Sequence, residues 1–165
     1  MNLLDKTPMD SVLLRRAFAC FPSGVTAVCG LDCGAPLGMA ASTFTPVSMA
    51  PSLVSICVQD TSRTWPTMRT LPRLGVSVLA EGQDAACRSL AGKQEDRFTN
   101  VDWVADGRGS VYIHGASLWL DCSIHTELPG GDHTIVLLRI HGLKVEPDRA
   151  PLVFHGSRFR RLAAS

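Results

Sequence analysis

Apolar residues recur along this chain at two different spacings. Near the N-terminus Leu14, Ala17, Phe18 and Phe21 follow one another at three- and four-residue steps, which predicts an amphipathic helix capped by Asp10 or Ser11. Beyond residue 24 the apolar residues form short runs separated by Gly, Pro and Asp, the pattern of strands and turns. Strands are predicted over residues 25–31, 37–44, 52–59, 74–79, 116–127, 133–145 and 151–155.

The clearest alternation lies in residues 116–127. Leu118, Leu120, Cys122 and Ile124 face one way, while Ser117, Trp119, Asp121, Ser123 and His125 face the other. Short helices are predicted over residues 62–69 and 82–90, a loop between Pro46 and Pro51, and a long surface loop over residues 96–109. Regular strand–helix alternation is absent, so we expect a mainly β fold, an antiparallel barrel with helical inserts, and no Rossmann sheet.

Composition narrows the class of protein. The chain has 165 residues, of which 45% are hydrophobic and 19% charged, with a formal net charge of +1. One domain over residues 1–165 suits that length, and the charge balance argues against a general nucleic-acid binder or a disordered chain. No apolar run approaches the roughly 18 residues that span a membrane, and residues 1–6 do not resemble a signal peptide. We therefore expect a cytoplasmic protein that contacts neither membrane nor nucleic acid.

The cysteines do not predict a metal centre. Cys29 and Cys33 have a spacing that suits half a site, but no second Cys/His pair accompanies them, so we predict no metal. The chain also lacks the short motifs of dinucleotide-binding Rossmann domains, P-loops, serine-hydrolase elbows and zinc proteases.

Three local clusters carry candidate chemistry. Residues 38–45 begin with Gly38 and run through small and hydroxylated side chains, which let a flat ligand approach the backbone. Residues 61–64 combine three hydroxyls with Arg63 at the expected start of a helix, a suitable anion site. His133 follows two glycines and Asp132 at the mouth of a predicted strand. Taken singly, the clusters are typical of a packed strand, an ordinary helix cap and a polar surface histidine.

In this order, however, the clusters resemble the flavin reductase family of the FMN-binding split-barrel type, over about residues 16–162. The resemblance rests on six segments: Phe-Pro-Ser-Gly-Val-Thr at 21–26, Gly-Met-Ala-Ala-Ser-Thr-Phe-Thr-Pro-Val-Ser at 38–48, Pro-Ser-Leu-Val at 51–54, Asp-Arg-Phe at 96–98, Gly-Asp-His-Thr at 131–134 and Pro-Leu-Val-Phe at 151–154. It implies a Greek-key split β-barrel that forms a homodimer, with the flavin bound at the dimer interface.

The resemblance also implies roles for particular residues. Met39, Ala40, Ala41, Ser42 and Thr43 would line the isoalloxazine and the ribityl chain. Ser62, Arg63 and Thr64 would hold the phosphate, Ala91 and Gly92 would border the distal part of the flavin, and His133 would contact the nicotinamide. Thr26 and Arg158 lie in segments that line the same cleft in the family. Trp119, on the outer face of its strand, suits the subunit interface of an obligate dimer.

The function implied is hydride transfer from NADH or NADPH to FMN or FAD, with reduced flavin passed to a separate flavin-dependent monooxygenase. The cofactors supply the chemistry, and the protein supplies orientation and electrostatics. Alternatives are a flavin-binding module without turnover, a relative of pyridoxamine-phosphate oxidase that would use the basic residues 158–161, and a small hydrolase or metal protein built on Asp132-His133 or on Cys29 and Cys33.

Overall fold

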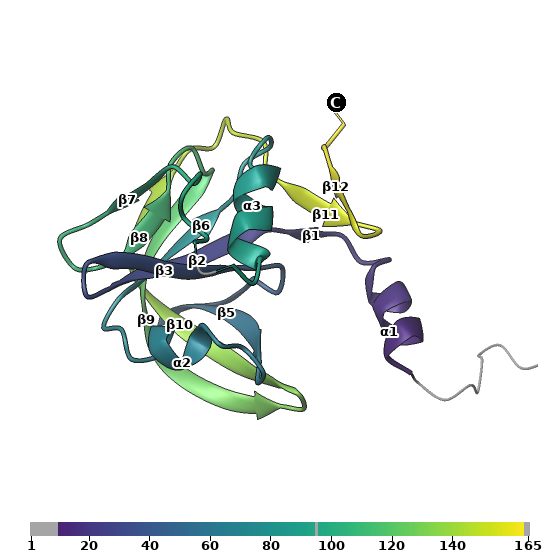
Figure 1. The fold of residues 1–165 in the computed structure, drawn as a ribbon, viewed down its shortest axis with the longest axis horizontal. Helices are drawn as coiled ribbons and strands as arrows, with labels where there is room; N and C mark the ends of the chain where they lie inside the picture. The colour runs from purple at the N-terminus through teal and green to yellow at the C-terminus, as the bar shows by residue number, and fades with distance from the viewer. Residues whose placement is uncertain (1–9, 95, 164–165) are drawn as a thin grey trace, which may run out of the picture.

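The structure, a computed structural model, describes residues 10–94 and 96–163 of the chain (Figure 1). Most of this part is β-structure. The elements, in chain order, are α1 (Ser11–Phe18), β1 (Ser23–Gly24), β2 (Thr26–Asp32), β3 (Ala35–Ala41), β4 (Thr45–Met49), β5 (Ser52–Gln59), α2 (Trp65–Met68), β6 (Leu74–Val78), α3 (Asp84–Ala91), β7 (Trp103–Ala105), β8 (Val111–Ile113), β9 (Leu118–Gly130), β10 (His133–Val145), β11 (Val153–His155) and β12 (Arg158–Arg160).

The main sheet has seven antiparallel strands in the order β3-β2-β6-β9-β10-β5-β4, so β3 and β4 are its edge strands. The sheet curls so that β3, at one end of the strand order, approaches β5, which is next to the other end (Figure 1). The two strands do not form a ladder with each other. The result is a barrel that stays split beside β3, which confirms the expected mainly β split-barrel fold.

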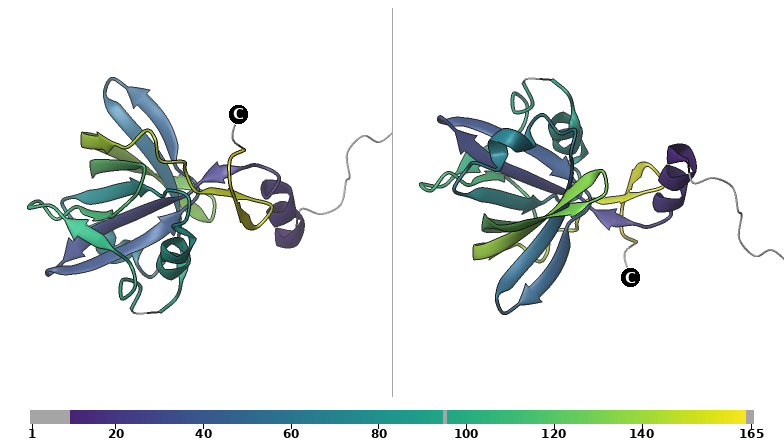
Figure 2. Two further views of the ribbon diagram at one scale, coloured as in Figure 1. Left: turned by 90° about the horizontal axis from the view of Figure 1, so that it is seen from above. Right: turned by 90° about the horizontal axis from the view of Figure 1, so that it is seen from below.

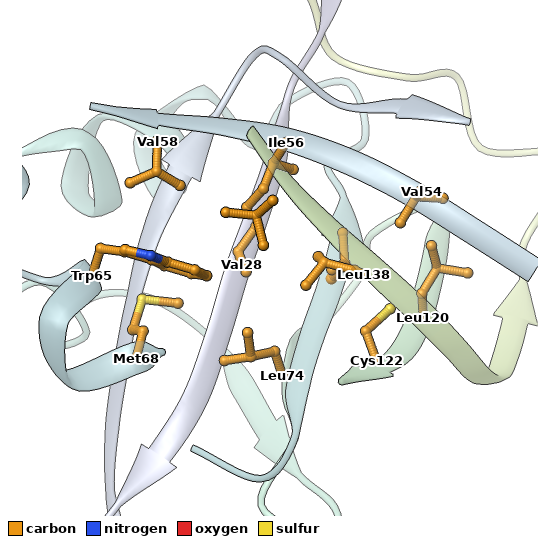
Figure 3. Close-up of a cluster of buried hydrophobic side chains, with 12 residues drawn as sticks. Val28, Val54, Ile56, Val58, Trp65, Met68, Leu74, Leu120, Cys122 and Leu138 are labelled. Atoms are coloured by element: carbon orange, nitrogen blue, oxygen red, sulfur yellow. The ribbon is translucent and has the colours of Figure 1, made fainter. Parts of the chain in front are cut away.

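Two apolar clusters lie on opposite faces of β2 and β6. One cluster fills the barrel, where Trp65 and Met68 of α2 pack beside Val28 and Val58 (Figure 3). The other lies under α3 and the β7–β8 hairpin and includes Ala27, Cys29, Leu79, Leu90 and Val111. Because both faces of β2 are covered, consecutive residues 25–30 are buried, which is why this strand lacks a period-two pattern.

The helix α1 stands away from the barrel on a small sheet of β1, β11 and β12 (Figures 1 and 2). It begins as predicted, with the Asp10 carboxylate accepting a hydrogen bond of 2.7 Å from the backbone N–H of Leu13. None of its residues is buried, and Phe18 and the following Phe21 are 70% and 78% exposed. The apolar face that the sequence predicts therefore has no partner within the described chain.

Three segments differ from the sequence-based prediction. Residues 45–49, expected to be loop, form the edge strand β4, where Pro46 is tolerated because one side of an edge strand makes no ladder. The expected surface loop over residues 96–109 contains β7, which pairs with β8. Part of the basic tail forms β12, which pairs with β11.

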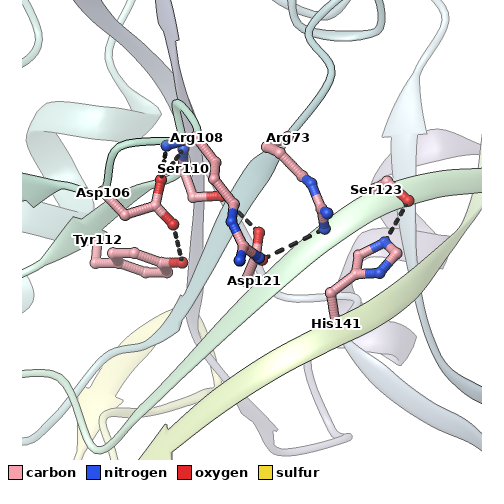
Figure 4. A network of polar contacts seen from close by, with 8 residues as sticks. All are labelled: Arg73, Asp106, Arg108, Ser110, Tyr112, Asp121, Ser123 and His141. Atoms are coloured by element: carbon pink, nitrogen blue, oxygen red, sulfur yellow. Dashed lines mark hydrogen bonds and ion pairs between the residues drawn. The ribbon is translucent and has the colours of Figure 1, made fainter.

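Asp121 lies in the face of β9 that the alternation sets opposite Leu118, Leu120, Cys122 and Ile124. The structure buries this residue to 8% exposure. Its carboxylate accepts a hydrogen bond of 2.8 Å from the Ser110 hydroxyl and forms ion pairs with Arg73 and Arg108 at 3.3 and 3.5 Å (Figure 4). A charge taken out of water needs such partners, and here they fix the hairpin to the sheet.

Trp119, on the same face, is partly covered within the chain. Its indole N–H donates to the carbonyl of Ile113 at 2.8 Å, its ring stacks on Tyr112 at 5.1 Å, and the Lys144 ammonium lies 5.0 Å above it. The predicted subunit interface at this residue stays a prediction, because contacts within one chain already account for part of the surface of Trp119. Its apolar surface is used to hold the β7–β8 hairpin.

We predict that Asp121→Ala lowers the free energy of unfolding by about 2 kcal/mol, because it leaves the buried Ser110 hydroxyl without its acceptor and removes the ion pair with Arg73. Arg108→Ala is the control, with an expected loss under about 1 kcal/mol since this side chain is 66% exposed. Urea unfolding followed by circular dichroism measures both. Equal losses for the two variants would contradict the assignment of Asp121 as the centre of the network.

Candidate active site

A groove of about 620 Å³ opens beside the free edge of β3. One wall is the end of β3 and the residues after it, and the other walls come from the end of β5, the loop before α2 and the C-terminal end of α3. Its lining residues are Met39, Ala40, Ala41, Ser42, Thr43, Cys57, Val58, Gln59, Thr61, Ser62, Arg63, Thr64, Leu90, Ala91, Gly92, Lys93, Arg97 and His133.

The β3 wall combines small side chains with outward-facing backbone groups. The carbonyl of Gly38 accepts a hydrogen bond of 3.1 Å from Arg97, so it points away from β2. Peptide groups alternate in direction along a strand, so the N–H and C=O of Ala40 point to the same open side. Gly38 itself has no room for a side chain, since a Cβ there would lie 2.5 Å from the Cys29 sulfur. This wall can hydrogen-bond the edge of a flat polar ring.

Thr43 closes the groove at one end. Its hydroxyl accepts a hydrogen bond of 2.8 Å from the Cys57 N–H and lies 3.2 Å from the Cys57 carbonyl, to which it donates. A side chain thus ties the segment after β3 to β5 where no strand ladder forms. The hydroxyl proton of Thr43 is already used, so of the two hydroxyls predicted to meet a ligand, the exposed Ser42 is the available donor.

The loop of residues 61–64 carries the expected anion site in a modified form. The Ser62 hydroxyl accepts a hydrogen bond of 3.2 Å from the Trp65 N–H, and the Thr64 hydroxyl accepts one of 2.9 Å from Arg97. Both hydroxyl protons remain for donation to an anion. The helix α2 is only four residues long, so the site relies on these hydroxyls and on Arg63 rather than on a helix dipole.

Trp65 anchors that loop to the barrel. It is 6% exposed, and its indole N–H donates to the Glu127 carboxylate at 2.9 Å. Glu127 also forms a 2.5 Å ion pair with Arg69, so the single carboxylate holds both ends of α2 against β9.

His133 is the first residue of β10 and pairs in register with Gln59 of β5. The turn before it places Gly131 at φ +81°, a conformation that suits glycine. The Nδ1 atom of His133 lies 2.7 Å from the Asp132 carboxylate. This hydrogen bond lowers the pKa of the Asp132 carboxyl below its ordinary value. The contribution of this contact to stability is therefore complete above the ordinary carboxyl pKa and is lost as pH falls through the lowered one. At neutral pH Nδ1 carries a proton for Asp132, and Nε2 is the ring atom left for a ligand.

All but two of the residues predicted from the sequence lie together in this groove. Thr26 and Arg158 do not line it. Thr26 is 1% exposed, and its hydroxyl donates to the carbonyl of Ala41 at 3.0 Å, which supports the β3 wall from behind. Arg158 is exposed on β12.

The sequence reasoning gave no site role to Arg97, Lys93, Cys57 or Gln59, although each lines the groove. For Arg97 a signal existed, because it is the central residue of the Asp-Arg-Phe segment that supports the family resemblance. The other three carry no local pattern that marks them.

The chemistry of the lining fits a flavin with a phosphate-bearing chain. Arg63, Lys93 and Arg97 supply three cationic side chains, and no Asp or Glu is among the lining residues in the described part of the chain. The small residues of β3 and the open peptide groups beside them suit one edge of an isoalloxazine ring. Among residues 10–94 and 96–163 no cluster of His, Cys, Asp and Glu is suited to a metal ion.

Comparison with known proteins decides the family. Residues 18–163 match the family described as flavin reductase like domain. The chain belongs to this family. It is 42% identical over 161 residues to a NADH-dependent FAD reductase of Streptomyces globisporus, a match that covers 94% of this chain and 88% of the relative. It is 31% identical to the reductase subunit HsaB of a flavin-dependent monooxygenase from Rhodococcus jostii, covering 92% and 77% of the two chains.

Solved structures agree with the fold. A NADH:FAD oxidoreductase of Streptomyces globisporus in complex with NAD and FAD fragments superimposes with a TM-score of 0.90 at 43% identity, covering 99% of this chain and 98% of that one. The flavin reductase component of a bacterial two-component tryptophan halogenase gives a TM-score of 0.85 at 30% identity, covering 94% and 100%. The resemblance and the enzyme class expected from the sequence, an NAD(P)H-dependent flavin reductase, are confirmed. Within the described residues, no helix is both long and apolar enough to cross a bilayer.

Proposed function

We propose that this flavin reductase takes hydride from NADH, delivers it to FAD, and supplies the reduced flavin to a separate flavin-dependent monooxygenase. The observation that carries the proposal is the groove, which gathers a flat polar strand edge, a cationic phosphate loop and a histidine. Similarity to the NADH-dependent FAD reductase and to monooxygenase reductase subunits supports this choice of cofactors and partner.

The groove residues divide into three roles. Met39, Ala40 and Ala41 present the edge of β3 to the isoalloxazine ring, and the Ser42 hydroxyl reaches the ribityl chain. Ser62, Arg63 and Thr64 hold the phosphate through hydroxyl protons and a guanidinium, a strong combination for an anion. Ala91 and Gly92, at the end of α3, border the distal part of the flavin without obstructing it.

A bound flavin would supply the hydride acceptor, and a bound reduced nicotinamide would supply the hydride. The protein has no proton to move in that step, so its contribution is to position the two rings. His133 contributes by holding the carboxamide of the nicotinamide through Nε2, while Asp132 fixes the imidazole ring through Nδ1. Because Asp132 is ionised at neutral pH, the imidazole is held in one orientation before the nicotinamide arrives.

The enzyme works as a homodimer in this proposal. The support is the resemblance to the family together with the bare apolar face of α1, since Phe18 and Phe21 would be costly to leave in water. A second copy of the chain covers this face.

The reductase activity is tested by adding NADH to the flavin-loaded protein without oxygen. We expect the flavin absorbance near 450 nm to bleach at a stoichiometry of one NADH per flavin, because two electrons pass in one hydride. Adding a flavin-dependent oxygenase and air then restores the absorbance. A flavin that stays oxidised would instead support the alternative of a flavin-binding module without turnover.

The role of His133 is tested with His133→Ala. Loss of one positioning hydrogen bond, worth roughly 1 kcal/mol, predicts an apparent KM for NADH about fivefold higher together with a lower kcat. His141→Ala on the same strand is the matched control, since His141 bonds Ser123 outside the groove. Anaerobic stopped-flow reduction gives both constants, and an unchanged rate and saturation in His133→Ala would remove this role.

Dimerisation is tested with the double change Phe18→Asp and Phe21→Asp. Both side chains are more than two-thirds exposed in one protomer, so the fold survives while the proposed interface gains two charges. Sedimentation velocity is expected to show a dimer for the natural chain and a monomer for the double variant. Val104→Asp, on β7, serves as the control, and a natural chain that stays monomeric at micromolar concentration would overturn the proposal.

A further inference from the structure

The groove has more cationic side chains than are needed to bind a single phosphate. Arg63, Lys93 and Arg97 all line it, and none of the three takes part in an ion pair within the described ranges 10–94 and 96–163. Other cationic side chains, such as Arg69 and Arg73, are paired with carboxylates. The groove therefore offers three unpaired cationic side chains to an anionic ligand, with no carboxylate among its described lining residues.

Arg97 is held in a fixed orientation by only one of its three nitrogens. Nη1 donates to the Gly38 carbonyl at 3.1 Å and to the Thr64 hydroxyl at 2.9 Å, and the Arg97 carbonyl accepts from the Ser89 hydroxyl at 2.7 Å. Both N–H groups of Nη1 are thereby used, while those of Nε and Nη2 have no partner among the described residues. These two nitrogens form the fork with which a guanidinium binds two oxygens of one phosphate.

This fork lies next to the first phosphate site. Thr64 receives the hydrogen bond from Arg97 and belongs to the same loop as Ser62 and Arg63, so one contact of 2.9 Å joins the two positions. Two phosphates that share a bridging oxygen need adjacent sites of this kind. Lys93 adds a further charge at the end of α3, where the partial negative charge of the helix C-terminus would otherwise repel an anion.

We propose that Arg97 and Lys93 form a second phosphate subsite, which makes the groove prefer a flavin dinucleotide, with its pyrophosphate, over the mononucleotide. This inference rests on the proposed flavin reductase function. Arg63 and the loop hydroxyls serve the phosphate that both flavins share. Arg97 and Lys93 serve the phosphate that only the dinucleotide carries.

The experiment measures dissociation constants of riboflavin, FMN and FAD by calorimetry at low salt. Lys93→Gln is the principal variant because Lys93 is exposed and its replacement leaves the fold intact. We expect about fivefold weaker FAD binding, the equivalent of one exposed charge contact of roughly 1 kcal/mol, with FMN and riboflavin unchanged. Arg63→Gln is expected to weaken FMN and FAD alike and to leave riboflavin unchanged.

Two further comparisons sharpen the result. Arg97→Lys keeps the charge but loses the fork, so FAD binding should weaken more than FMN binding, provided that circular dichroism shows a native fold. Lys144→Gln removes a charge far from the groove, on β10, and should change none of the constants.

The outcomes separate this inference from the proposed function. A Lys93→Gln protein that loses FMN and FAD affinity equally, or neither, overturns the second subsite while the enzyme still reduces flavin. A natural chain that binds FMN as tightly as FAD also overturns it. If the natural chain binds no flavin and oxidises no NADH, the proposed function itself fails.

Discussion

The unpaired edge of β3 is the constraint on which the site depends. A strand edge presents a row of peptide groups that bind other chains unless something covers or limits them. Here the row is interrupted at two points, by the Thr43 hydroxyl bound to Cys57 and by Arg97 bound to Gly38. Between these points the backbone stays open, and its small side chains leave it accessible. Because the barrel is split beside β3, this strand edge is accessible, and the rest of the fold holds the edge in place.

The difference between local sequence pattern and long-range pairing explains which elements could be predicted from the sequence. Residues 52–59 were predicted as a strand and form β5 with the same bounds, because a Val- and Ile-rich run between turn signals is a local property. The strands β4 and β7 were missed, because a proline and several polar residues hide them and only pairing with β5 and β8 makes them strands. The burial of Asp121 was not predicted, since its partners Arg73 and Ser110 come from other segments.

The site could be predicted where its residues are neighbours in the sequence. Met39 to Thr43 and Ser62 to Thr64 are runs of neighbours, and their place in the family pattern brought them into one groove. Arg97 needs the three-dimensional fold, because its two contacts lie 59 and 33 residues away along the chain. Thr26 is an instructive exception. It stands in a family segment, yet its side chain turns toward Ala41 and supports the wall instead of facing the groove.

Arg97 connects two walls of the groove from a segment that belongs to neither β3 nor the loop before α2. This side chain therefore helps to hold the two walls together at a place where no strand ladder joins them. In the proposed second phosphate subsite, the residues that select the flavin, Arg97 and Lys93, are separate from the sheet, the two apolar clusters and the ion pairs of Asp121 that stabilise the fold. Substitutions around Arg97 and Lys93 would then change which flavin binds while the barrel stays as it is.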